Sequence, residues 1–255
     1  KGPTGDKGPT GEGVTGPQGP QGDVGQGIQS IALRNSTISG QGTNSVAIGH
    51  LAGDSNQNDY AIAIGNNAGK ITQGPSSISI GDSAGYQNQK PYAIAIGEGA
   101  GSNTQGVYSI SIGLFAGFQN QRDYSISMGY YSGNNTQGEG SIAIGYSAGS
   151  KSQGNNSIAI GYQAGFTGQN IESIAIGDNA GFQYQQNGCI AIGQQSGFNN
   201  QGTGSIAIGQ YAGFDTQSQT TIAIGSYAGY TGQCQDSISI GDSAGFQYQQ
   251  NGCIA

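Results

Sequence analysis

The stretch "SIAIGYSAGSKSQGNN", residues 141–156, decides the fold because it recurs every sixteen residues from Ser45 to the end of the chain. The frame S-I-A-I-G-x-x-A-G-x-x-x-Q-x-x-x occurs thirteen times without an insertion, and the last coil, which begins at Cys253, is incomplete. Both glycines and the glutamine stand in all thirteen copies. Such regularity predicts a stacked architecture in which each unit contacts only its neighbours.

The pattern inside one repeat is that of short strands. In "SIAIG" the two β-branched residues face one side of a strand, and Ser and Ala face the other. The glycine ends the strand, and the glycine of "xxAG" allows a second corner with positive φ. We expect each unit to form one coil of a parallel β-solenoid or β-roll with a buried isoleucine column. Two buried isoleucines contribute roughly 3–6 kcal/mol, and ordering sixteen residues costs on the order of 20 kcal/mol, so coils must stack.

The repeated glutamine predicts an interior ladder. Coils stacked about 4.8 Å apart bring amide side chains to the spacing at which they hydrogen-bond to one another. A comb of glutamines that binds a ligand is the alternative. The residues are Gln57, Gln73, Gln89, Gln105, Gln121, Gln137, Gln153, Gln169, Gln185, Gln201, Gln217, Gln233 and Gln249.

The residue between the two isoleucines is Ala or Ser in every copy. A position held this small indicates that another backbone packs closely against it. Our interpretation is that this column lines the interface of a trimer, and tight packing within one coil is the alternative. The residues are Ala47, Ala63, Ser79, Ala95, Ser111, Ser127, Ala143, Ala159, Ala175, Ala191, Ala207, Ala223 and Ser239.

Residues 1–27 follow a different period. Glycine recurs every third residue, with one slip at Gly11-Glu12-Gly13 and proline in the X position. This pattern resembles collagen, in which three chains wind together because every third residue lacks a side chain. Thr4, Thr10 and Thr15 occupy the outward Y position and are candidates for glycosylation, with plain solvation as the alternative. Residues 28–44 are expected to form a transition and a capping coil before the thirteen repeats of residues 45–255.

The amino-acid composition limits which classes of binding partner are expected. Charged residues make up 8% of the chain, the net charge is −7, and the seven Lys and Arg residues are scattered. Nucleic acids and anionic membranes require clustered cations, so neither is an expected partner. The chain contains no run of 18 apolar residues, so we do not expect this segment to insert into a bilayer. The chain lacks a starting Met and stops within a repeat, which indicates a piece of a longer protein whose open final coil favours end-to-end filament assembly.

Few residues offer chemistry. His50 is the single histidine, and the carboxylates recur in no pair suited to acid–base work. We therefore expect no enzymatic activity, no cofactor and no metal. Cys189 and Cys253 share a repeat position roughly 19 Å apart, which is too far for a disulfide within one chain. We expect the cysteines to be small buried residues that replace serine, and a disulfide between two chains is the alternative.

Aromatic residues recur at two positions of the repeat. We expect their rings to stack in columns within or between chains, and carbohydrate binding by exposed rings is the alternative. One set follows "AG": Tyr86, Phe118, Phe166, Phe182, Phe198, Phe214, Tyr230 and Phe246. The other precedes the strand: Tyr60, Tyr92, Tyr108 and Tyr124.

"SVAIG" at 45–49 and the later "SIAIG" copies followed by "xxAG" resemble the head repeats of trimeric autotransporter adhesins. The resemblance covers residues 45–255 and implies an all-β, left-handed parallel β-roll that forms a homotrimer exposed on a surface. The N-terminal collagen-like rod and the uniform period depart from those heads. Our leading hypothesis is a structural, trimeric, fibrous protein, extracellular on a cell or virion surface. The alternative is an adhesin head that binds glycans or matrix. An ice-binding solenoid and a left-handed-helix transferase are less well supported.

Overall fold

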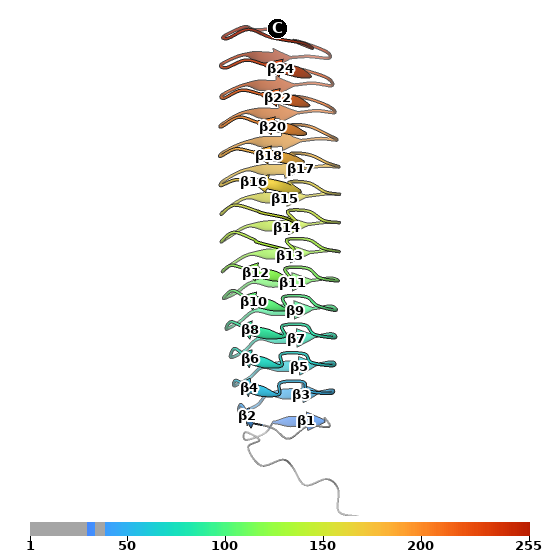
Figure 1. Cartoon of the computed structure of the whole chain (residues 1–255), viewed down its shortest axis with the longest axis vertical. Helices are drawn as coiled ribbons and strands as arrows, with labels where there is room; N and C mark the ends of the chain where they lie inside the picture. Colours follow the sequence, from blue (N-terminus) through green and yellow to red (C-terminus); the bar gives the residue numbers. More distant parts are fainter. Residues whose placement is uncertain (1–29, 34–38) are drawn as a thin grey trace, which may run out of the picture.

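Each sixteen-residue repeat winds into one coil of a parallel β-solenoid, and successive coils stack along a single axis (Figure 1). The computed structural model describes residues 30–33 and 39–255, and no helix occurs in these ranges. The collagen-like segment, with Thr4, Thr10 and Thr15, lies outside the described residues. The solenoid is therefore all-β, and each full repeat supplies one coil.

The first strand of every coil joins a sheet of fourteen parallel strands. Equivalent residues of neighbouring coils lie in register, as in Ala143 opposite Ala159. The capping coil takes part, since Ile31 pairs with Val46. In sheet order the strands are β1 (Ile31–Leu33), β3 (Val46–Ile48), β5 (Ile62–Ile64), β7 (Ile78–Ile80), β9 (Ile94–Ile96), β11 (Ile110–Ile112), β13 (Ile126–Met128), β14 (Ile142–Ile144), β15 (Ile158–Ile160), β17 (Ile174–Ile176), β19 (Ile190–Ile192), β21 (Ile206–Ile208), β23 (Ile222–Ile224) and β25 (Ile238–Ile240).

The second strand of the coil ends at the repeated glutamine and forms two shorter sheets, of six and five strands. Its middle residue has a positive φ, as at Asn88 (φ 56°), so only the two outer residues pair with the next coil. Isolated bridges through Gln137 and Gln153 connect the two sheets. The first sheet contains β2 (Ser39–Gln41), β4 (Ser55–Gln57), β6 (Ile71–Gln73), β8 (Gln87–Gln89), β10 (Asn103–Gln105) and β12 (Gln119–Gln121). The second contains β16 (Thr167–Gln169), β18 (Gln183–Gln185), β20 (Asn199–Gln201), β22 (Asp215–Gln217) and β24 (Thr231–Gln233).

The two repeated glycines are required by close packing as well as by backbone conformation. Gly161 has a φ of +132°, and a Cβ placed on it would lie 2.5 Å from the carbonyl oxygen of Gly177 in the next coil. Gly165 has a φ of +54°, and its added Cβ would lie 2.5 Å from Oε1 of Gln169. A side chain at Gly161 therefore collides with the next coil, and one at Gly165 collides with the glutamine inside its own coil.

The interior of the coil holds the small residues and the glutamines, and the isoleucines face outward. The prediction of an isoleucine column buried inside the coil is therefore wrong. Ile158 and Ile160 are only half-buried, whereas Ala159 between them is 0% exposed. The interior is narrow, since a Cβ added to Gly165 would lie 3.3 Å from the Cβ of Ala159. Alanine from "xxAG" completes this core, as in the cluster of Ala47, Ala52, Ala63 and Ala68.

The interpretation of the small column as a trimer interface is also wrong. All of its members are 0% exposed within a single chain, so no surface remains for a neighbouring chain to touch. Tight packing within one coil, the alternative, explains their size. The residues are Ala47, Ala63, Ser79, Ala95, Ser111, Ser127, Ala143, Ala159, Ala175, Ala191, Ala207, Ala223 and Ser239.

Candidate functional site

The repeated glutamines cross the interior of the coil and hydrogen-bond in two directions. Gln201 Nε2 donates to the carbonyl oxygen of Ile190, across its own coil, at 3.0 Å. The same nitrogen donates to Oε1 of Gln217, in the next coil, at 3.0 Å. Equivalent side-chain bonds join Gln57 to Gln73, Gln89 to Gln105, Gln121 to Gln137, Gln185 to Gln201, Gln217 to Gln233 and Gln233 to Gln249.

This arrangement gives the glutamines a structural role. Each described ladder glutamine between Gln57 and Gln249 is at most 8% exposed, which leaves little of it accessible to a ligand. Buried amides need hydrogen-bonding partners, and the ladder supplies many of them from within the stack. The geometry therefore does not support the alternative that the glutamines form a ligand-binding row.

Serine in the small column supplies a further donor to the ladder. Ser79 Oγ donates to Oε1 of Gln89 at 2.8 Å, and Ser239 Oγ donates to Oε1 of Gln249 at 2.6 Å. Where the column holds alanine this donor is missing, and Oε1 of Gln169, behind Ala159, is buried without a partner. The choice between Ala and Ser thus changes how fully the interior amides are satisfied, which the sequence pattern alone did not reveal.

Cys189 occupies the serine position that precedes the first strand. Its Sγ lies 3.0 Å from the carbonyl oxygen of Gly202, the acceptor that Ser205 also uses. Burial raises the pKa of the Cys189 thiol above its ordinary value. Cys234 is half-buried and Cys253 is exposed, and all three are free thiols. The buried replacement for serine that the sequence predicts is therefore found at Cys189.

The outward face of the fourteen-stranded sheet is continuously apolar. Both outward positions of each strand hold Ile, Val, Leu or Met throughout β1 to β25, with no polar or charged member. These side chains are half-buried or exposed, with Ile80 36% and Leu33 64% exposed. We call the two columns from Ile31 and Leu33 to Ile238 and Ile240 the isoleucine face. Fourteen strands about 4.8 Å apart make it about 60 Å long, and contiguous exposed apolar surface of this kind marks an interaction site.

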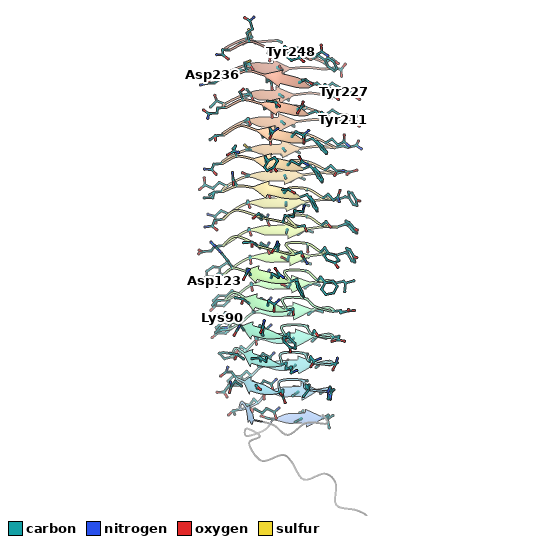
Figure 2. All side chains as sticks on the ribbon, viewed as in Figure 1. Lys90, Asp123, Tyr211, Tyr227, Asp236 and Tyr248 are labelled. Carbon is teal, nitrogen blue, oxygen red and sulfur yellow. The ribbon has the colours of Figure 1, made fainter. Side chains whose placement is uncertain are left out.

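Aromatic rings form further columns at the corners of the coil. The rings of Phe166, Phe182 and Phe198 stack with centroids 5.2 and 4.9 Å apart, and the column continues through Phe214, Tyr230 and Phe246. Shorter columns contain Tyr92, Tyr108 and Tyr124, and Tyr130, Tyr146 and Tyr162. In Figure 2, Tyr211 and Tyr227 lie one above the other along one edge of the solenoid, while Asp236 lies on the opposite edge. The expected stacking of rings thus occurs within one chain.

His50 is exposed in a turn. Within the described ranges, no group of three or more His, Cys, Asp or Glu side chains is placed to hold a metal ion. The same residues include no helix that is long and apolar enough to cross a membrane.

Part of the repeat region matches the model of a known protein family. The family model described as "YadA head domain repeat" matches two overlapping copies, at residues 123–148 and 137–164. These segments contain β13, β14 and β15 with the corners that follow them. No curated protein sequence matches the chain. The repeats of this β-solenoid are therefore similar to those of adhesin heads.

Proposed function

We propose that this chain is a non-enzymatic structural protein of a trimeric fibre, extracellular on a cell or virion surface, with its isoleucine face turned toward the threefold axis. The observation that carries the proposal is the isoleucine face itself. An apolar strip about 60 Å long would be costly to leave in water, and flat apolar sheet faces promote association when uncovered.

The occupant we propose for this face is two further copies of the same chain. The face is uniform from coil to coil, so identical chains in register meet the same side chains along its whole length, as closed symmetry requires. Its lack of charge leaves nothing to repel a copy of itself. The number three is favoured by the Gly-X-Y segment of residues 1–27, since a collagen helix contains three chains, and by the resemblance to trimeric heads.

Sedimentation equilibrium of the whole chain tests the proposal. We expect a mass of three chains of 25.7 kDa. The double change Ile142→Asn with Ile158→Asn places amides on the isoleucine face and should shift the equilibrium toward monomer. The matched control is Tyr92→Asn with Tyr108→Asn, at exposed turn positions of positive φ that Asn adopts readily. A monomeric unchanged chain, or equal loss of trimer in both variants, would refute the arrangement.

An adhesin head is the alternative function, favoured by the match to the YadA head repeat and by the exposed aromatic columns. Rings exposed on a rigid scaffold suit recognition of glycans or matrix proteins. Attachment of the purified trimer to glycan or matrix surfaces, competed by soluble ligand, would favour it over a purely structural role.

A further inference from the structure

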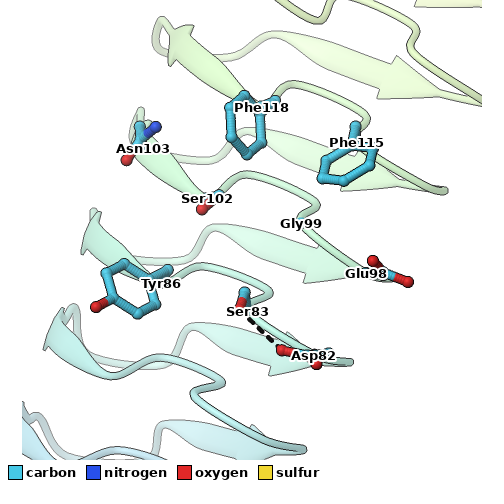
Figure 3. A pocket seen from close by; sticks show the side chains of 9 residues that line it. All are labelled: Asp82, Ser83, Tyr86, Glu98, Gly99, Ser102, Asn103, Phe115 and Phe118. Atoms are coloured by element: carbon cyan, nitrogen blue, oxygen red, sulfur yellow. Dashed lines mark hydrogen bonds between the residues drawn. The ribbon is translucent and has the colours of Figure 1, made fainter.

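We infer that the corner between Tyr86 and Phe118 is a binding site for a single pyranose ring that carries no carboxylate. The inference deepens the adhesin alternative by naming a site and a ligand class. It can fail without affecting the trimeric fibre, because the site is built from one chain. Figure 3 shows the cavity with its lining side chains.

The cavity lies where an aromatic column is interrupted between Tyr86 and Phe118. Tyr86, Ser102 and Phe118 occupy the same repeat position in three successive coils, so Ser102 stands where a ring would otherwise stack. The resulting open cavity has a volume of about 470 Å³. Gly99, in the neighbouring column, adds no side chain to fill it, and the ring of Phe115 leans over this glycine. The cavity thus has aromatic walls and a floor of small residues.

The height of the cavity favours a saturated ring over a planar one. Residues two coils apart are separated by about 9.6 Å, and contact with a ring on each side takes up about 3.5–4 Å per side, together about 7–8 Å. About 2 Å remains for the thickness of the ligand's own ring of atoms, which is more than a flat ring needs. A pyranose chair, thickened by its axial hydrogens, fills this space and places C–H groups against both rings. Pockets that combine apolar walls with a few polar groups are typical of small-ligand sites.

The polar groups at the rim indicate which sugars fit. Asp82 and Glu98 line the cavity and are exposed. The hydrogen-bond donors to Asp82 are neutral: Asn66 Nδ2 at 3.3 Å and Ser83 Oγ at 2.8 Å. Within residues 30–33 and 39–255, neither carboxylate forms an ion pair, and the Nζ of Lys70 lies instead over the Tyr86 ring, 5.3 Å from its centroid. Two carboxylates without an ion-pair partner accept hydrogen bonds from hydroxyls, attract an ammonium group and repel an acid. Amino sugars should therefore bind best, neutral hexoses less well, and uronic acids not at all.

Titration of the whole chain with glucosamine, glucose and glucuronate, followed by saturation-transfer NMR, tests the site. We expect millimolar affinity in that order, with no signal for glucuronate. Ser102→Phe completes the column, fills the cavity and should abolish binding. Ser150→Phe makes the same change at the same repeat position away from the cavity and should leave binding intact. Glu98→Gln should reduce the preference for glucosamine over glucose at least threefold.

Three outcomes would overturn the inference: no binding of any of the three sugars at 100 mM, glucuronate bound as well as glucosamine, or equal loss of binding in Ser102→Phe and Ser150→Phe. Thermal unfolding of both variants checks that they remain folded. The sedimentation mass is measured on the same samples, so that loss of sugar binding is distinguished from loss of the trimer.

Discussion

Gln201 and Gln217, sixteen residues apart, form one step of an amide ladder inside the solenoid: Nε2 of Gln201 donates to Oε1 of Gln217 at 3.0 Å. Gln201 also accepts from Gln185 Nε2 at 2.8 Å and donates to the carbonyl oxygen of Ile190 at 3.0 Å. One side chain therefore connects three coils and both strands of its own coil.

Replacement of this side chain by alanine should destabilise the stack. Gln201→Ala leaves a cavity and removes the partners of the Ile190 carbonyl and the two neighbouring amides, each a loss of about 1 kcal/mol or more. We expect the free energy of unfolding to fall by about 3 kcal/mol, measured by urea denaturation at one fixed protein concentration. Gln194→Ala, at an exposed glutamine, should change it by less than about 0.5 kcal/mol. Similar losses in the two variants would show that the ladder does not carry this stability.

A hydroxyl added behind the ladder should stabilise it. Gln169 Oε1 is buried without a partner, and Ala159 lies at the position from which serine donates to the ladder elsewhere, as Ser79 does to Gln89. Ala159→Ser should raise the free energy of unfolding by about 1 kcal/mol, because it satisfies a buried acceptor. Ala159→Leu, at the same site, should lower it by about 1–3 kcal/mol, because the interior has no room. Destabilisation by the serine would contradict the proposed hydrogen bond.

The sequence predicted the stack, the strand pairs and the glutamine ladder because these follow from the sixteen-residue period and from residue type. It did not predict which side of "SIAIG" faces inward. Alternation shows only that isoleucine and alanine lie on opposite faces, and hydrophobicity alone would place isoleucine inside. The coil is too narrow, as the approach of Gly165 to Ala159 shows. The cavity at Ser102 was visible in the sequence only as a serine between Tyr86 and Phe118 in a column of aromatic residues.

The first glycine of the repeat should tolerate no side chain. Gly161→Ala places a Cβ 2.5 Å from the carbonyl oxygen of Gly177, at a φ of +132°. We expect it to lower the free energy of unfolding by more than about 3 kcal/mol. Gly188→Ala isolates the backbone cost, because Gly188 also has a positive φ, +66°, but no atom lies within 4 Å of its added Cβ. That variant should lose only about 1–2 kcal/mol. Equal losses would mean that conformation, and not coil-to-coil contact, selects glycine at position 161.

The three thiols should react with iodoacetamide at different rates. Cys253 is exposed, Cys234 is half-buried, and Cys189 is buried with its pKa raised by desolvation. Since the thiolate is the nucleophile, a raised pKa lowers the reactive fraction of Cys189 at every pH below that pKa. Mass spectrometry of labelled peptides should show alkylation in the order Cys253, Cys234, Cys189, with Cys189 at least tenfold slower than Cys253 at pH 8. In 6 M urea the three rates should converge, because unfolding removes the burial; rapid labelling of Cys189 in the folded protein would contradict its place in the interior of the coil.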